Sequence, residues 1–177
     1  MPNWCSNTLT VTGDDHLVTQ FADRVKTVIP AETSALVSRQ ARTHLLDLAK
    51  VMPVPDGLSE DERYTWRVNN WGTKWSPGAA DVVVDDGPGV RVYSFDTAWS
   101  PLGPRFMAKL AEVFPSLNFS LFAQEPGNLI EVQATVVLGE LVDYDEREMQ
   151  TQDDDFNYAA DDETDEELQG SDDPLEN

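Results

Sequence analysis

The sequence predicts an α+β protein: a ferredoxin-like βαββαβ sandwich with an extra C-terminal strand, a helical insertion after the first helix and a disordered acidic tail. Two kinds of segment support this prediction, because short stretches alternate between apolar and polar residues while others repeat apolar residues at helical spacing. Their order along the chain is that of the βαββαβ fold. The 177 residues suffice for one domain with its own core and a tail. We place the domain at residues 1–142, the insertion at about 31–78 and the tail at 143–177.

The first strand and the first helix follow from their periodicities. Between residues 3 and 12 every second side chain belongs to one face of a half-buried strand: Cys5, Asn7, Leu9 and Val11. Asp14 and Asp15 are typical N-cap and first-turn residues of a helix. Apolar residues then recur at helical spacing: Leu17, Val18, Phe21, Ala22, Val25 and Val28. We therefore expect this helix to continue until Pro30.

The insertion contains one clear helix. Ser59 is followed three residues later by Glu62, which forms a capping box, and apolar residues follow at spacings of four and three. The pattern predicts a helix over 60–71 that ends at Gly72. The apolar residues within 45–51 fit either a short helix or an extended segment.

The second half of the domain predicts two pairs of strands around a helix. Pro101 and Pro104 open this helix and Pro115 closes it. The turn at 86–89 contains two glycines and a proline, which is typical of a hairpin. The four strands are expected at 81–85, 90–97, 117–124 and 130–138.

The formal charge of −21 is concentrated at the C-terminus. Residues 143–177 hold sixteen acids and one base, whereas residues 1–142 hold seventeen acids and eleven bases. Repulsion among these acids and the scarcity of apolar residues predict a disordered or partly helical tail. The tail is either a solubilising segment or a segment that docks on a basic, apolar groove of a partner. The residues assigned to that docking are Asp153, Asp154, Asp155, Phe156, Tyr158, Asp161, Asp162 and Glu163.

Charge and composition exclude several classes of function. A strongly negative chain repels phosphate, so direct binding to nucleic acid or to anionic membranes is not expected. The sequence has no apolar run of the roughly 18 to 20 residues that a membrane helix needs, and its start has no signal-peptide pattern. We therefore expect a cytoplasmic protein. Because Cys5 is the only cysteine, the chain can form no internal disulfide. One cysteine and two histidines also leave few ligands for a metal site, and we expect no metal and no cofactor.

Catalytic motifs are missing as well. The sequence has no GxSxG elbow, no phosphate-binding loop and no HExxH motif, and Cys5 lies inside the first strand, where a small buried side chain is expected. Asp85 and Asp86 form a carboxylate pair, but acids are common in hairpin turns. We therefore expect no enzymatic activity.

Three segments of unusual composition carry a family resemblance. They are residues 1–13 (MPNWCSNTLTVTG), 70–75 (NWGTKW) and 93–101 (YSFDTAWSP), with shorter matches at 52–55 and 124–127. In these segments the chain resembles the family of small phage and plasmid proteins typified by YubB. The resemblance implies a ferredoxin-like domain and an origin in a mobile element, and it implies no established activity. It does not extend to the acidic tail or to residues 31–43.

The same segments hold four of the five tryptophans. Trp4 falls on the hydroxyl-bearing face of the first strand, where it either packs with Trp71 and Trp75 beneath the insertion or belongs to a binding surface. If the insertion packs there, Lys74 and Asp96 are expected to form a buried or half-buried ion pair. The candidate binding residues of the domain are Trp4, Trp71, Lys74, Trp75, Asp96 and Trp99.

These observations support three hypotheses for function. The first is a non-enzymatic phage or plasmid accessory protein that binds a host protein with a basic groove in the bacterial cytoplasm. Its acids would imitate the charge of nucleic acid and inhibit a defence or DNA-handling enzyme. The second is a module that stacks single-stranded nucleic acid on Trp4, Tyr93 or Phe95 of the sheet face. The third is an enzyme of unknown type.

Overall fold

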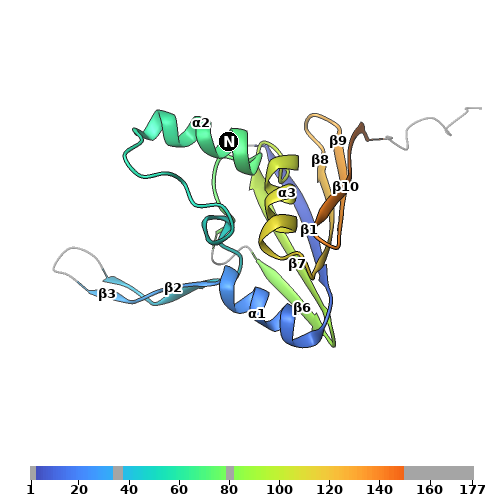
Figure 1. The fold of residues 1–177 in the computed structure, drawn as a ribbon. Coiled ribbons are helices and arrows are strands. Elements are labelled where there is room, and N and C mark those ends of the chain that lie inside the picture. The colour runs from blue at the N-terminus through green and yellow to red at the C-terminus, as the bar shows by residue number, and fades with distance from the viewer. Residues whose placement is uncertain (1–2, 34–37, 79–81, 150–177) are drawn as a thin grey trace, which may run out of the picture.

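The computed structural model describes residues 3–33, 38–78 and 82–149, and its centre is a six-stranded sheet. Helices α1 (Asp15–Val25) and α3 (Pro104–Val113) lie on one face of this sheet (Figure 1). Neighbouring strands are antiparallel, in the order β10-β9-β8-β1-β7-β6. The strands are β1 (Trp4–Thr12), β6 (Val83–Gly87), β7 (Val90–Ala98), β8 (Asn118–Glu125), β9 (Ile130–Val137) and β10 (Glu140–Glu148).

The four strands β8-β1-β7-β6 confirm the predicted ferredoxin-like fold. Helix α1 and the insertion join β1 to β6, and β7 lies between these two strands. Helix α3 joins β7 to β8, and β1 lies between them. Two interleaved units of this kind make up the βαββαβ sandwich, with both helices on the same side.

Strands β9 and β10 extend the sheet beyond β8, whereas the sequence predicted one extra strand and a tail from residue 143. That boundary is wrong, because β10 continues to Glu148. A register shift between Leu141 and Asp143 interrupts the pairing of β10 with β9. A bulge of this kind breaks the alternation of side chains, and the sequence pattern therefore ended where the strand continues.

A contact with the helix layer holds β10 in place. The hydroxyl of Tyr144 donates to the carbonyl of Leu102, just before α3, at 3.0 Å. Burial raises the pKa of Tyr144 to about 12, so this phenol remains a donor. The predicted docking residues of the tail, from Asp153 to Glu163, lie outside the described residues.

The first half of the insertion is extended rather than helical. Helix α1 ends at Val25, and the next residues form β2 (Thr27–Ile29), which pairs with β5 (Arg42–His44). A second short pair, β3 (Glu32–Thr33) with β4 (Ser38–Arg39), continues this arm away from the sheet (Figure 1).

Val28, predicted on the buried face of the first helix, is instead exposed in β2. Three consecutive β-branched residues favour a strand, and the residue before Pro30 disfavours helical backbone. The helical spacing of Val28 relative to Val25 is therefore coincidental. The second half of the insertion is helical, with the short 3-10 helix η1 (Leu48–Lys50) and α2 (Glu60–Trp71).

Helix α2 has the predicted boundaries. The backbone N–H of Ser59 donates to the Glu62 carboxylate at 2.8 Å, and the N–H of Glu62 donates to the Ser59 hydroxyl at 3.4 Å. At the other end Gly72 has a φ of 87°, the left-handed conformation that glycine adopts without strain. A Cβ on Gly72 would also lie 2.3 Å from the backbone nitrogen of Gly103, so glycine allows α2 to meet the start of α3.

We expect the replacement Ser59→Ala to lower the free energy of unfolding by about 1 kcal/mol at neutral pH, because the helix loses its cap. Hydrogen bonds from Ser59 hold the pKa of Glu62 below its ordinary value. The stability that this interaction contributes is complete above the pKa that Glu62 has in the unfolded chain. It is lost as the pH falls through the lower pKa that Glu62 has in the folded chain. Denaturant titrations at neutral pH and at about pH 3 should therefore show a smaller effect in acid. An effect that grows in acid would contradict this assignment.

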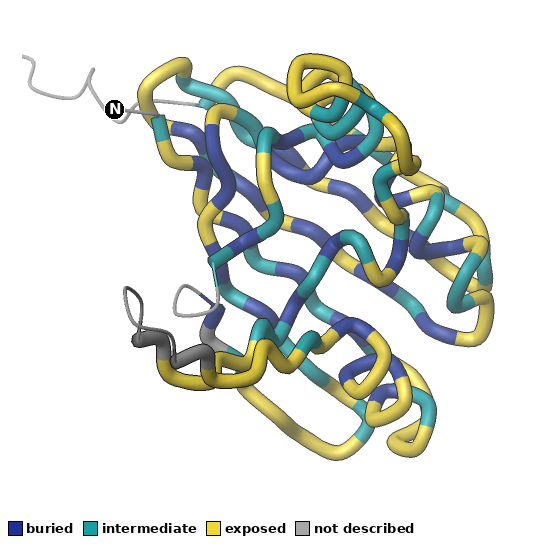
Figure 2. The backbone as a smooth tube through the Cα atoms, turned by 90° about the vertical axis from the view of Figure 1, so that its left-hand side faces the viewer, coloured by how far each residue is buried: buried dark blue, intermediate teal, exposed yellow. Residues whose placement is uncertain are grey.

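The hydrophobic core lies between the sheet and the helices. Buried and exposed residues alternate along the strands (Figure 2). Phe21 of α1 occupies the centre, with its ring 5.9 Å from Tyr93, 4.9 Å from Phe114 and 5.5 Å from Phe119, measured between centroids.

None of the helices that the structure describes is long and apolar enough to span a membrane.

Candidate functional site

The face of the sheet opposite α1 and α3 is the main candidate site, and we call it the open face. Strand registers align its residues in rows across the sheet. One row runs from Arg147 on β10 through Glu131, Gln124 and Ser6 to Asp96 on β7. The two rows below it hold mainly hydroxyl, amide and carboxylate groups: Asp145, Gln133, Phe122, Thr8 and Ser94, then Asp143, Thr135, Ser120, Thr10, Val92 and Asp85.

The open face is acidic. Among the described residues of this face, Arg147 is the one basic side chain. Its Nε donates to Glu131 at 2.9 Å. This guanidinium, followed by the amide of Gln124, holds the pKa of Glu131 below its ordinary value. Arg147 is therefore neutralised, and the face is negative at neutral pH. The carboxylates that leave this excess are Asp85, Asp96, Asp143 and Asp145.

Two exposed aromatic side chains accompany the acids. Trp4 is 55% exposed at the start of β1, and Phe122 is 40% exposed near the middle of the face. Tyr93 and Phe95, which the sequence offered as a stacking platform with Trp4, are buried on the helix side, so that part of the prediction is wrong. Sequence reasoning missed Phe122, although the alternation of β8 places it opposite the buried Phe119.

The tryptophans of the second family-like segment have different roles. Trp71 is buried, its Nε1 donates to the carbonyl of Met52 at 2.9 Å, and its ring packs edge to face with Trp66 at 6.0 Å. Trp71 is therefore a core residue, and the packing of Trp71 with Trp4 that the sequence suggested is absent among these described contacts. Trp75, by contrast, is exposed.

Lys74 does not pair with Asp96 among the described residues, contrary to the expectation. Its Nζ instead lies 4.3 Å from the centre of the Trp75 ring and 5.5 Å from that of Tyr64. Such cation–π contacts are favourable at the surface, by about 0.5 to 1 kcal/mol. Lys74 therefore links Trp75 to Tyr64 of α2 and leaves the Asp96 carboxylate accessible.

The segments that carry the exposed tryptophans all contact the end of β7 at Ala98 and Trp99. Trp4 pairs with Ala98 in the β1–β7 register, and the N–H of Trp99 donates to the carbonyl of Asn3 at 2.9 Å. The hydroxyl of Thr73, two residues before Trp75, donates to the Ala98 carbonyl at 3.1 Å. The structure thus brings the three family-like segments to the same end of the sheet.

A buried hydrogen-bond network connects the first of these segments to the third. The Nδ2 of Asn7 donates to the carbonyl of Cys5 and to the hydroxyl of Thr97, both at 2.8 Å. Its Oδ1 accepts from the N–H of Leu102 at 3.4 Å, and Thr97 in turn donates to the carbonyl of Ser100 at 2.7 Å. Asn7 therefore holds the loop that carries Trp99 against β1.

A buried carboxylate orders the neighbouring turn. The two oxygens of Glu125 accept from the backbone N–H groups of Gly127 and Asn128, each at 2.8 Å. The side chain is 1% exposed, so the turn shields it from water. Glu125 and Asn7 therefore have structural roles, and the open face is the part of this region that is accessible to a partner.

Cys5 should be chemically inert in the folded protein. The side chain is fully buried, and burial, with smaller contributions from the charges of Glu125 and Asp96, raises the pKa of its thiol to about 12. The thiolate that reacts with alkylating reagents is then almost absent at mildly alkaline pH. We expect no labelling of the native chain by iodoacetamide and complete labelling at one site after unfolding in guanidinium chloride. Rapid labelling of the native chain would contradict the burial of Cys5.

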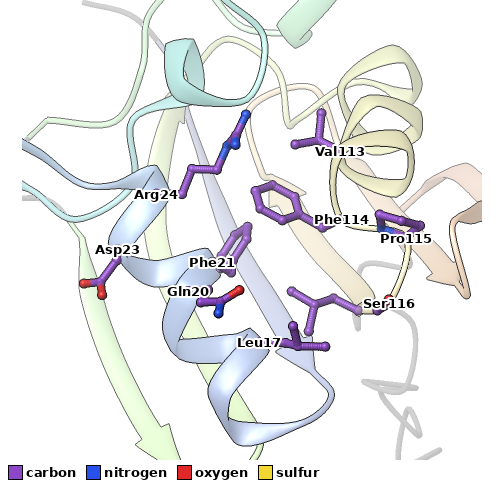
Figure 3. A pocket seen from close by; sticks show the side chains of 10 residues that line it. Leu17, Gln20, Phe21, Asp23, Arg24, Val113, Phe114, Pro115 and Ser116 are labelled. Carbon is purple, nitrogen blue, oxygen red and sulfur yellow. The ribbon is translucent and has the colours of Figure 1, made fainter.

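A hollow of about 620 Å³ lies on the helix side, between α1 and the end of α3 (Figure 3). Leu17, Phe21 and Phe114 line it, and the Arg24 guanidinium lies 5.7 Å from the centre of the Phe114 ring. The volume suits a small molecule. Its polar lining side chains are all exposed, and they are Gln20, Asp23, Arg24 and Ser116. Among the residues that the structure describes, the hollow therefore has no buried polar group that would select a ligand, and we assign it no function.

The described residues contain no group of three or more His, Cys, Asp or Glu side chains that could hold a metal ion. The acids of the open face are spread over several strands, and they therefore form a charged surface. That surface can bind cations of a macromolecular partner at several points.

Comparisons with known proteins agree with this fold. Residues 70–168 match the family described as the ferredoxin-like domain in Api92-like protein, and this segment includes β10. The crystal structure of a protein Api92 from Yersinia pseudotuberculosis is similar, with a TM-score of 0.62 and 12% sequence identity over 85% of this chain and 100% of that chain. No protein of established annotation matches the sequence. The chain therefore belongs to the Api92-like family and carries its ferredoxin-like domain.

Proposed function

We propose that this protein is a non-enzymatic binding protein that attaches to a basic nucleic-acid groove of a host protein through its open face. The observation that carries the proposal is the set of carboxylates held on rigid strands. Asp143 and Asp145 lie about 7 Å apart along β10, and Asp96 on β7 lies four strand spacings, about 19 Å, across the sheet from that strand. The spacing along β10 is of the same order as that of the phosphates along one strand of B-DNA, which presents one charge per about 3.4 Å of axis.

Strand β10 adds further charge at the edge of the sheet. Glu140, Glu146 and Glu148 are exposed on this strand. Glu146 pairs with the buried Val132, so the side chains of Glu146 and Glu148 lie on the helix side of the sheet edge. The acid-rich residues from 150 onward follow directly along the chain. The negative surface is therefore continuous in sequence with the tail, and both would be attracted to the same basic groove.

The origin of the chain belongs to the same proposal. The similarity of residues 1–13, 70–75 and 93–101 to YubB-like phage and plasmid proteins supports a mobile-element protein that acts in the cytoplasm of a bacterial host. A host enzyme of defence or DNA handling has the required basic groove. Occupation of that groove by the open face would inhibit the enzyme by competition with nucleic acid.

The exposed Trp4 and Phe122 favour a second function, the binding of single-stranded nucleic acid by stacking. The carboxylates of the open face, of which Asp96 is a diagonal neighbour of Trp4, repel phosphate and oppose this function. A salt-dependent shift of the protein with single-stranded DNA at micromolar concentration would favour this second function over mimicry.

Affinity capture from a bacterial lysate tests the proposed function. The bait is the full chain, compared with the triple variant Asp96→Asn, Asp143→Asn and Asp145→Asn. A matched control removes the same charge from α2 and α3 by Glu60→Gln, Asp61→Asn and Glu112→Gln, at positions that are exposed. We expect nucleic-acid-binding proteins on the wild-type and control baits, released by added duplex DNA, and their loss from the triple variant. Equal capture by all three baits would refute the open face as the binding surface.

The role of the tail needs its own variant. Replacement of Asp153, Asp154 and Asp155 by asparagine in the full chain removes part of its charge. If the tail contributes to binding, this variant should release the captured proteins at lower salt than the wild type does. Release at the same salt concentration would assign the tail a solubilising role.

A further inference from the structure

The small side chain of Ser6 leaves a shallow position at the centre of the first row of the open face. Ser6 is paired with Asp96 on β7 and with Gln124 on β8, and Trp4 precedes it on the same face of β1. Two strand spacings separate the Cα atoms of Asp96 and Gln124, which is about 10 Å. The longer side chains of Trp4, Asp96 and Gln124 therefore surround a low floor at Ser6.

The groups around this position are hydrogen-bond acceptors. The Nε2 of Gln124 donates to Glu131 at 2.9 Å, and a carboxylate only accepts, so the amide oxygen of Gln124 points away from this bond and accepts none from the described residues. Glu131 is itself held by Arg147, which keeps the amide in this orientation. Asp96 is exposed and makes no hydrogen bond or ion pair among the described residues. The position thus offers the Asp96 carboxylate and the Gln124 oxygen to a donor.

Trp4 supplies an aromatic surface beside these acceptors. Trp4 is 55% exposed at the start of β1, next to this row. Diagonal neighbours on adjacent strands are about 7 to 8 Å apart, which is within reach of a tryptophan side chain, so Trp4 and Asp96 can contact the same ligand. An aromatic face together with a carboxylate is complementary to a cation.

We propose that Trp4, Ser6, Asp96 and Gln124 form a recognition site for an arginine side chain of the partner. A guanidinium is planar, carries five N–H donors and stacks on aromatic rings, so it can satisfy Asp96, Gln124 and Trp4 together. A lysine ammonium is a strongly hydrated point charge without a planar face, and it satisfies fewer of these groups. The inference rests on the proposed function, because it names the side chain by which a basic partner would be recognised.

The test compares two fluorescent peptides with the full chain, an arginine–glycine repeat and a lysine–glycine repeat of equal length and charge. Fluorescence anisotropy should show that the arginine peptide binds about tenfold more tightly. Trp4→Ala and Asp96→Asn should each reduce the ratio of the two affinities to about one. Asp145→Asn, a matched loss of charge in another row, should weaken both peptides and preserve the ratio.

Each outcome decides between the two proposals. Equal affinity of the wild type for both peptides, or an unchanged ratio in Trp4→Ala, overturns the arginine site and leaves the acidic docking surface intact. Failure of both peptides to bind at low salt overturns the docking surface as well. Trp4 is exposed, so Trp4→Ala should fold, and circular dichroism checks this. Trp4→Tyr, which keeps an aromatic face, should restore part of the preference for arginine.

Discussion

Replacement of Phe21 by alanine should lower the free energy of unfolding by about 4 kcal/mol, the largest loss we expect from any single change discussed for this chain. The Phe21 side chain is fully buried, and its ring meets Tyr93, Phe114 and Phe119 in edge-to-face contacts. The variant loses both the transfer free energy of the ring and these aromatic contacts, and it leaves a cavity between α1 and the sheet.

Phe122→Ala is the matched control, because it removes the same side chain from the opposite face. Phe122 is 40% exposed on the open face, so its loss should cost only about 1 kcal/mol. Denaturant titration followed by circular dichroism measures both values. Similar losses in the two variants would mean that the open face is covered in solution.

The second large effect is expected for Asn7→Ala, with a loss of about 3 kcal/mol. The change leaves the N–H of Leu102, the hydroxyl of Thr97 and the carbonyl of Cys5 without the amide that now satisfies them. Buried polar groups without partners are costly, because the unfolded chain satisfies them with water.

The neighbouring substitution Ser6→Ala provides the comparison for Asn7→Ala. Ser6 is exposed and its hydroxyl makes one long contact, of 3.5 Å, with the Gln124 carbonyl. We expect its loss to be less than about 0.5 kcal/mol. Hydrogen exchange adds a local readout, since Asn7→Ala should accelerate exchange at Leu102, whose N–H Asn7 binds. Protection equal to the wild type at Leu102 would show that Asn7 does not hold this loop.

The fold was predictable where local signals and tertiary packing agree. The capping box at Ser59 and the left-handed Gly72 are local features, and α2 begins and ends where they predict. Strand β10 was missed because a bulge after Leu141 shifts the alternation, and such a bulge depends on pairing with β9. The arm at β2 was missed because Val28 continues a helical spacing by chance.

The candidate site was predictable in part. The alternation of side chains along a strand assigns Trp4 and Asp96 each to one face of its strand. The sequence does not tell which of the two faces the helices cover. The sequence therefore permits Tyr93 as a stacking residue, whereas in the structure α1 covers it and Phe21 contacts its ring. Trp71 and Trp75 are only four residues apart, and the turn at Gly72 separates a core residue from a surface one.

The acidic end strands of the sheet have a consequence for the behaviour of the protein at high concentration. An end strand presents unpaired backbone groups to which another molecule can add a strand. Strand β10 carries Glu140, Asp143 and Asp145, and β6 at the other end carries Asp85 and Asp86. At neutral pH these carboxylates repel the end strand of an approaching copy and disfavour intermolecular sheet growth. High salt screens this repulsion, and light scattering in concentrated salt should then detect more self-association through the edges of the sheet.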